Sequence, residues 1–191
     1  SYDKRRSDFF TNELIILLKL IDSKKVNSNL LYGSWAGAFG NFQFMPSTIK
    51  NYAVDSDKNF KIELKKIEDS FASAANYISS IGWNNKEPCF QKVYLTDNIP
   101  KKYLNSSAKK IVNKKQFKFF KKYIKNLKDF KIDDKKLTGI ITPDKDIVKN
   151  SKTLEPAYLV FNNYELILKW NRSLRFALAV CTLKDNFKNE I

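Results

Sequence analysis

A cluster of glycines between residues 33 and 48 is the feature that most constrains how this chain folds. Gly33, Gly37 and Gly40 are three of only five glycines in 191 residues, so the backbone here must turn tightly or lie close against something that a Cβ would obstruct. Aromatic side chains with a few polar ones among them suit a concave ligand site, and they suit a packed loop equally well. Pro46 then predicts a helix start, because proline at the first helical position loses no needed N–H.

Apolar periodicity predicts a helix over residues 7–26, with a single stripe expected to face the core. The stripe consists of Phe10, Leu14, Leu17, Leu18 and Ile21. Further helices are predicted over residues 46–54, 69–81, 164–170 and 173–187, and one amphipathic helix through residues 117–127. Strands are predicted over residues 89–95, 137–141 and 157–161. The fold class is therefore α+β and mainly α, with a small mixed subdomain over residues 84–161.

The chain is strongly basic, with a net charge of +15 and fourteen lysines between Lys101 and Lys136. Such a segment attracts polyanions, although a solvated lysine face is an open alternative. Lysine without arginine is a weak nucleic-acid signal, because guanidinium groups make the bidentate contacts to phosphate and guanine. No nucleic-acid partner is therefore expected. No apolar run reaches the roughly 18 residues that span a bilayer, so this stretch is expected to hold no transmembrane segment.

Cysteine and histidine usage argues against a zinc site. Cys89 and Cys181 lack metal-ligand spacing, and the chain contains no histidine, which removes the other common zinc ligand. One disulfide between them is possible, but the sequence alone does not decide their redox state.

Several separated blocks resemble the motifs of one bacterial enzyme family, the B-type lytic murein transglycosylases. The first block is GSWAGAFGNFQFMPSTIKNYAVDSD, residues 33–57, and the second is residues 161–173 followed by residues 176–180. Shorter matches in the same order are Arg5-Arg6, Phe9-Phe10, Glu13-Leu14, Ala74-Ala75-Asn76-Tyr77 and Gly82-Trp83. The resemblance spans nearly the whole chain and is weakest over residues 84–153. It implies a lysozyme-like helical domain over residues 1–83, to which helices in residues 162–191 return.

The resemblance implies an activity on peptidoglycan. The family cleaves the β-1,4 bond from N-acetylmuramic acid to N-acetylglucosamine and closes a 1,6-anhydro ring, so the nucleophile is a hydroxyl of the substrate and one glutamic acid suffices. That glutamate precedes the position of Ser1 in the family, and no catalytic residue is expected within this chain. Glu13 is interpreted as structural. We therefore expect a C-terminal portion of a larger enzyme, inactive alone. The alternative is a non-catalytic wall-binding or scaffold protein.

A substrate-binding set follows from the same resemblance. Its members are Ser34, Gln43, Tyr77, Asn171, Trp170, Phe176, Arg5, Arg6 and Phe9. Ser34 would orient the catalytic carboxyl, whereas Gln43 and Asn171 would contact N-acetyl or hydroxyl groups of the sugars. Tyrosine is common in the family at positions 9, 170 and 176, so phenolic hydrogen bonds are lost there and only stacking remains. For the aromatic residues and the arginines, core packing or surface charge is an equally open interpretation.

The resemblance also implies a weak, structural calcium site and no organic cofactor. Oxygen-bearing side chains at positions 1, 3 and 5 of a loop, with a backbone carbonyl at position 7, are what calcium uses in an EF-hand. The ligands would be Asp55, Asp57, Asn59, the carbonyl of Lys61, and Asp69. Phe60 replaces the glycine of the sharp turn, and Lys58 adds positive charge, so an empty acidic turn is the alternative.

The implied partners are peptidoglycan glycan strands, and cell-wall synthesis proteins are an open further option. The implied location is the periplasm, with an outer-membrane lipid anchor on a preceding segment as an option.

Overall fold

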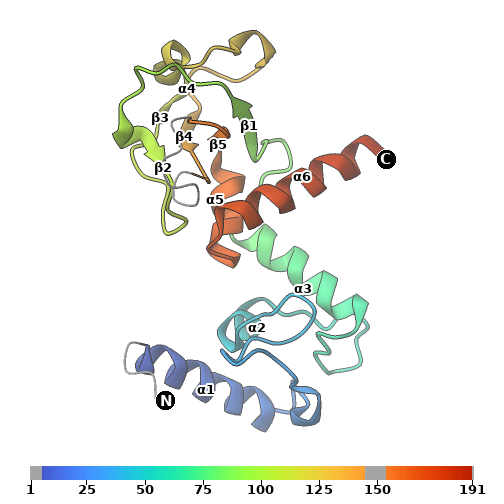
Figure 1. Cartoon of the computed structure of the whole chain (residues 1–191). Coiled ribbons are helices and arrows are strands. Elements are labelled where there is room, and N and C mark those ends of the chain that lie inside the picture. The colour runs from blue at the N-terminus through green and yellow to red at the C-terminus, as the bar shows by residue number, and fades with distance from the viewer. Residues whose placement is uncertain (1–5, 145–153, 191) are drawn as a thin grey trace. The chain divides into compact units, whose positions relative to one another are not determined.

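The computed structural model describes residues 6–144 and 154–190, and the chain divides into two compact units, residues 1–82 and 83–191 (Figure 1). The first unit contains α1 (Ser7–Asp22), the 3₁₀ turn η1 (Ser28–Leu30), α2 (Pro46–Tyr52) and α3 (Ile67–Ser80). Each of the three α-helices agrees with a predicted one to within a few residues. In the parts of the chain that the structure describes, no helix is long and apolar enough to cross a membrane.

The apolar stripe of α1 does not form the core of this unit, contrary to the prediction. Leu14 and Leu18 are 55% and 56% exposed, whereas the buried residues of the helix are Glu13 and Leu20. Glu13 is buried because its carboxylate accepts hydrogen bonds from the Ser47 backbone N–H (2.8 Å) and hydroxyl (2.7 Å) at the start of α2. It thereby satisfies an N–H that has no partner within α2. These two bonds give Glu13 a structural contact between α1 and α2, and the side of α1 that carries Glu13 is the covered one.

The glycine-rich loop, residues 33–45, folds back on itself before α2. Phe39 and Phe44 exchange two backbone hydrogen bonds, each 3.0 Å long. Gly40 has a φ of +80°, and a Cβ on it would lie 2.5 Å from the Cβ of Leu64. Both reasons predicted for the glycines, a tight turn and a close approach, therefore apply at Gly40.

The second unit is built on a five-stranded sheet in the order β1-β5-β4-β2, with β3 also pairing with β4. The strands are β1 (Phe90–Val93), β2 (Leu104–Asn105), β3 (Lys115–Gln116), β4 (Leu137–Ile141) and β5 (Ala157–Val160). The pairing of β2 with β4 is parallel and the other pairings are antiparallel. Buried side chains such as Ile140 and Leu159, which are opposite one another in the register, form the core.

The segment between β2 and β4 carries short helical turns instead of the one long helix predicted there. The turns are α4 (Phe117–Phe120), η3 (Lys121–Tyr123) and η4 (Leu127–Asp129), and a further one, η2 (Lys101–Tyr103), directly precedes β2. A bridge between Leu95 and Ile124 ends the helical stretch, and the N–H of Lys125 donates to the Tyr94 carbonyl (2.8 Å). The backbone groups that would continue the helix are therefore used in pairing with the segment after β1.

Two helices, α5 (Asn162–Trp170) and α6 (Leu174–Glu190), complete the second unit. The Tyr164 hydroxyl donates to the Leu174 carbonyl (2.7 Å) and joins the two helices. Cys89 and Cys181 form a disulfide, which the sequence had left open, and it ties α6 to the start of β1. The contacts within the chain group residues 162–190 with the sheet. The resemblance implies that residues 162–191 belong with residues 1–83, and this stays a prediction.

Candidate functional site

Gln43 is exposed at the tip of the glycine-rich loop in an unusual backbone conformation. Its φ is +52°, in the left-handed region that few residues other than glycine adopt. Its Nε2 donates to the Gly40 carbonyl (3.0 Å), and its own backbone N–H donates to the same oxygen (3.1 Å). A residue keeps such a strained backbone only where the contacts around it hold it there, and strained residues are common at binding sites. The carboxamide of Gln43 is therefore held in one place at the surface.

Ser34 begins the same loop and is bound to it through local contacts. Its Oγ accepts a hydrogen bond from the Ala38 backbone N–H (3.2 Å). A hydroxyl that accepts in this way keeps its hydrogen available to donate to another group. Ser34 can therefore offer a hydrogen bond to a carboxylate, which is the chemistry that its predicted role requires.

Tyr77 lies on α3, and its ring packs against α2 and the glycine-rich loop. Its ring centroid is 5.0 Å from that of Tyr52 and 5.9 Å from that of Phe44. Burial raises the pKa of the Tyr77 phenol above its ordinary value, with a smaller effect from Tyr52. The phenol therefore stays protonated at neutral pH and is a hydrogen-bond donor. Sequence reasoning gave no site role to Tyr52, and no sequence signal pairs it with Tyr77.

Asn171, Trp170 and Phe176 belong to the second unit: Trp170 ends α5, Asn171 lies in the turn that follows, and Phe176 lies in the first turn of α6. Asn171 is exposed, and its backbone N–H donates to the Ile167 carbonyl (3.0 Å) at the end of α5. Ser173 caps α6 as the sequence predicts, because its Oγ accepts from the Phe176 backbone N–H (3.2 Å). Three of the predicted residues thus lie at or beside the junction of α5 and α6. That they share one groove with the residues of the first unit stays a prediction.

The start of α1 carries a cation over two aromatic rings. The Arg6 guanidinium lies 4.5 Å from the Phe9 ring centroid and 5.2 Å from that of Phe10. Trp35 is 91% exposed, its ring is 6.3 Å from that of Phe10, and both rings line a cavity of 400 Å³. Arg5 lies outside the described residues. Trp35 was not in the predicted substrate-binding set, although its place among the aromatic residues of the glycine-rich stretch was a signal.

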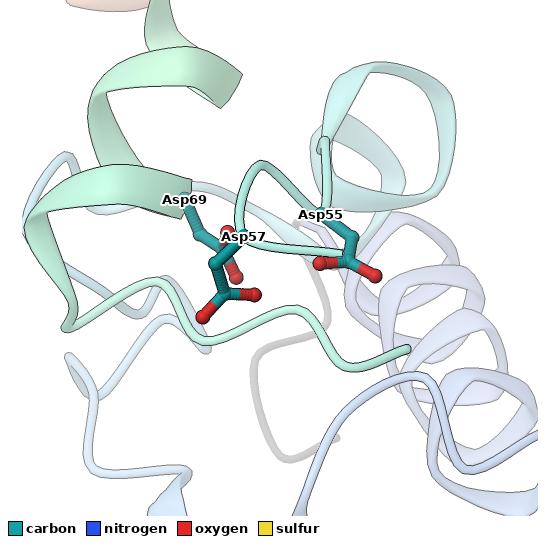
Figure 2. A group of neighbouring side chains, drawn as sticks. All are labelled: Asp55, Asp57 and Asp69. Atoms are coloured by element: carbon teal, nitrogen blue, oxygen red, sulfur yellow. The ribbon is translucent and has the colours of Figure 1, made fainter. Parts of the chain in front are cut away.

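Three carboxylates converge where the loop after α2 meets the start of α3. Ligand atoms of Asp55, Asp57 and Asp69 lie within 4.8 Å of one another, and Figure 2 shows the side chains on their two segments. Asp69 is fully buried and accepts from the backbone N–H groups of Ser56 and Glu63, each at 2.8 Å. The buried carboxylate thus holds both ends of the acidic loop.

The turn within the acidic loop has a positive φ at a residue other than glycine. Phe60 takes the sixth position, where an EF-hand needs glycine, and its φ is +67°. Its N–H donates to Asp55 Oδ2 (2.7 Å), while the Asn59 N–H donates to Asp55 Oδ1 (3.1 Å). The carboxylate of Asp55 therefore stabilises a turn that the side chain of Phe60 disfavours.

The predicted ligand Asn59 already uses its side chain in hydrogen bonds within the loop. The Asn59 side-chain N–H groups donate to Asp57 (2.8 Å) and Glu63 (2.9 Å), so its amide already bridges two carboxylates. Glu63 was missed, although it stands at the ninth position of the loop, where EF-hands often bind through water. Lys66 and then Asn59 lower the pKa of Glu63 through hydrogen bonds. Three or four hard carboxylate oxygens are a donor set that fits calcium.

Residues 1–185 match the family model described as the Transglycosylase SLT domain. The chain belongs to this family. Within the Transglycosylase SLT family, Membrane-bound lytic murein transglycosylase B of Escherichia coli (strain K12) is 40% identical over 79 residues, which are 41% of this chain and 22% of that protein. The predicted resemblance to B-type lytic murein transglycosylases is confirmed.

Solved structures of lytic transglycosylases share the fold. SltB3 from Pseudomonas aeruginosa in complex with NAG-anhNAM-pentapeptide has a TM-score of 0.78 and 29% identity over 98% of this chain and 48% of that chain. Lytic transglycosylase Slt35 of Escherichia coli in complex with calcium has a TM-score of 0.72 and 23% identity over 95% of this chain and 54% of that chain. The predicted class, α+β and mainly α with a lysozyme-like fold, is confirmed. The chain spans about half the length of these two solved structures, and its match to the curated relative covers 22% of that protein.

Proposed function

We propose that this chain forms part of a peptidoglycan lytic transglycosylase that cleaves bonds between N-acetylmuramic acid and N-acetylglucosamine with formation of 1,6-anhydro products. The observation that carries the proposal is the family match over residues 1–185. The complex of SltB3 with NAG-anhNAM-pentapeptide supports it, because that ligand has an anhydromuramoyl end. In this proposal the general acid is a glutamate outside these 191 residues, since Glu13 is engaged with Ser47.

The loop residues of the first unit would position the reacting groups. A reaction in which the substrate supplies its own nucleophile needs one proton donor and accurate placement of the sugar. Ser34 would donate its free hydroxyl hydrogen to the catalytic carboxyl. Gln43 would present its carboxamide to an N-acetyl group, and its fixed backbone supports this role because little ordering is left for substrate binding. Tyr77 would add a phenolic donor.

The second unit and the start of α1 would hold the glycan strand at further points. Asn171 would bind a sugar hydroxyl or N-acetyl group, and Trp170 and Phe176 would stack on sugar faces. At α1, Phe9 would stack likewise, and Arg6 would attract the carboxylates of peptidoglycan peptides. Support comes from the exposure of Asn171, Arg6 and Phe9.

The periplasm is the proposed location. The disulfide between Cys89 and Cys181 supports it, because disulfides persist in oxidising compartments and are rare in the cytosol. The relative from Escherichia coli is described as membrane-bound. An anchor for the protein that contains this chain would fit that description.

Calcium is the proposed ligand of the acidic loop. Asp55, Asp57 and Asp69 would hold the ion, with the Lys61 carbonyl and Glu63 as further oxygen donors. An ion there would displace the amide group of Asn59 from its bridging position and would stabilise the first unit without taking part in the chemistry. In calorimetric titration we expect weak calcium binding near the millimolar range, as in extracellular sites. Asp57→Asn should weaken it at least about tenfold, and no binding at about 10 mM calcium would contradict the assignment.

The test of the function compares products released from purified peptidoglycan by mass spectrometry. A protein that contains this chain and the preceding segment is expected to release 1,6-anhydro muropeptides. Gln43→Ala and Asn171→Ala in that protein should lower turnover about 100-fold without lowering the melting temperature, as loss of a positioning contact does. The 191-residue chain alone is expected to release none. Products with reducing ends would overturn the lyase assignment, and wall binding without any product would favour the non-catalytic alternative.

A further inference from the structure

The second unit carries many exposed lysines that its own carboxylates do not neutralise. Of the fourteen lysines between Lys101 and Lys136, three form ion pairs with described residues: Lys114 with Glu165, Lys121 with Asp134 and Lys136 with Glu87. The other eleven are exposed and form no ion pair with any described side chain. They are Lys101, Lys102, Lys109, Lys110, Lys115, Lys118, Lys122, Lys125, Lys128, Lys131 and Lys135.

Part of this charge is gathered on one side of α4 and η3. Lys118 and Lys122 are four residues apart along these consecutive helical turns, so they share a face, while Phe117 and Phe120 are buried on the other side. The N–H of Lys118 donates to the Asp134 carbonyl (3.0 Å), which brings the segment with Lys135 alongside.

Lys115 belongs to β3, and β3 directly precedes α4 in the chain (Figure 1). We call Lys115, Lys118, Lys122 and Lys135 the basic face.

The folded state gains little from these lysines. Like charges four residues apart on a helical face repel each other. Lys122 does lie over the Phe119 and Tyr123 rings, with its ammonium 5.1 Å and 4.9 Å from their centroids. Since its side chain is still exposed, this contact leaves its charge available to a partner.

Exposed aliphatic side chains occur close to these lysines along the chain. Leu137, in β4 opposite Gln116, is 52% exposed, and Val112, which follows Lys110 closely, is 46% exposed. No arginine occurs between Lys101 and Lys136. A surface that combines lysines with aliphatic side chains suits a phosphate layer above hydrocarbon. Nucleic-acid recognition favours arginine, whereas a bilayer offers the aliphatic side chains a hydrocarbon layer directly below its phosphates.

We propose that the basic face of the second unit binds the anionic headgroup surface of a phospholipid bilayer. The lysines act as point charges toward lipid phosphates, and Leu137 and Val112 enter the interface between headgroups and acyl chains. None of these residues is among the proposed glycan-binding residues, so the inference does not rest on the transglycosylase function.

Co-sedimentation of the 191-residue chain with vesicles tests the proposal. We expect binding to phosphatidylcholine vesicles that contain roughly one quarter phosphatidylglycerol and none to pure phosphatidylcholine, with weaker binding at about 150 mM than at about 20 mM NaCl. Each lysine brought to the membrane surface strengthens binding by about tenfold or less. Lys118→Glu with Lys122→Glu removes two such lysines and adds repulsion between glutamate and lipid phosphate, so the partition coefficient should fall at least about 30-fold. Leu137→Ser should weaken binding without changing the charge.

Lys19→Glu with Lys50→Glu, two exposed helical positions of the first unit, is the matched control with the same change in net charge. It should change binding by less than about threefold, since both positions are outside the basic face. Equal losses in both double variants would overturn the proposal, as would absence of vesicle binding at low salt. Preferential binding of purified peptidoglycan or RNA, lost with the Lys118 and Lys122 variants, would assign the surface to another polyanion. Lys118→Gln with Lys122→Gln replaces the glutamate variant if circular dichroism shows misfolding.

Discussion

Asp69→Asn is the substitution that tests most directly how the acidic loop is held. Both carboxylate oxygens of Asp69 accept a backbone N–H, Oδ1 from Ser56 and Oδ2 from Glu63, each at 2.8 Å, and the side chain is fully buried. Asparagine has nearly the same shape, but it offers only one acceptor oxygen. Its amide N–H₂ group must therefore face one of the two backbone N–H groups.

The expected loss of stability follows from these two bonds. A hydrogen bond to a charged group contributes about 1.5–3 kcal/mol, and a buried donor left without a partner costs about 1–3 kcal/mol. Asp69→Asn removes one bond outright and weakens the other, so the first unit should lose roughly 2–4 kcal/mol. Asp57→Asn is the matched control, because Asp57 is exposed, and it should cost less than about 1 kcal/mol.

Amide hydrogen exchange in EDTA is the decisive assay, since it isolates the two backbone N–H groups from metal binding and from the second unit. The Ser56 and Glu63 amides should exchange at least about 30-fold faster in Asp69→Asn than in the parent chain. Unchanged exchange at both amides, with a melting temperature equal to that of the parent, would show that Asp69 does not hold the loop.

Other substitutions test the remaining structural arguments. Gly40→Ala should destabilise the first unit by at least about 2 kcal/mol in thermal unfolding, because the new Cβ meets Leu64 at a φ of +80°; a neutral effect would contradict the close approach. Replacing Cys89 and Cys181 by alanine should cost about 3–5 kcal/mol in urea unfolding, since the bond closes a separation of 92 residues. Burial raises the pKa of the Tyr164 phenol above its ordinary value of 10, so the protonated phenol favours the folded state and stability falls as pH rises above about 10. Tyr164→Phe should lose less stability than the parent chain between about pH 9 and pH 11, and identical profiles of unfolding free energy against pH would refute this linkage.

Local sequence signals predicted the elements of the fold but not which of their faces are covered. Pro46 and Ser173 mark helix starts through backbone chemistry that depends on nearby residues alone, and both helices begin there. The exposure of Leu14 and the burial of Glu13 on α1 could not be predicted, because burial depends on contacts with distant segments, such as the one from Glu13 to Ser47 of α2. Periodicity predicts a helix and its stripe, whereas burial is set by contacts between distant segments.

The candidate site shows the same limit. The family resemblance implied that Asp55 and Asp57 lie near Asp69, and the structure brings them together. The sharp turn at Phe60 could not be predicted, because a rule based on intrinsic preference requires glycine there and hydrogen bonds to Asp55 override it. The strained backbone of Gln43 has no signal in the sequence either, since it results from the pairing on both sides of it.

The bond between Cys89 and Cys181 turns most of the second unit into a closed covalent ring that contains the whole lysine-rich segment. A protease that cuts after lysine and nicks this exposed segment once opens the ring but releases no fragment. The two pieces would migrate apart on a gel only after reduction. A surface attractive to trypsin-like enzymes can therefore be cleaved without the unit coming apart.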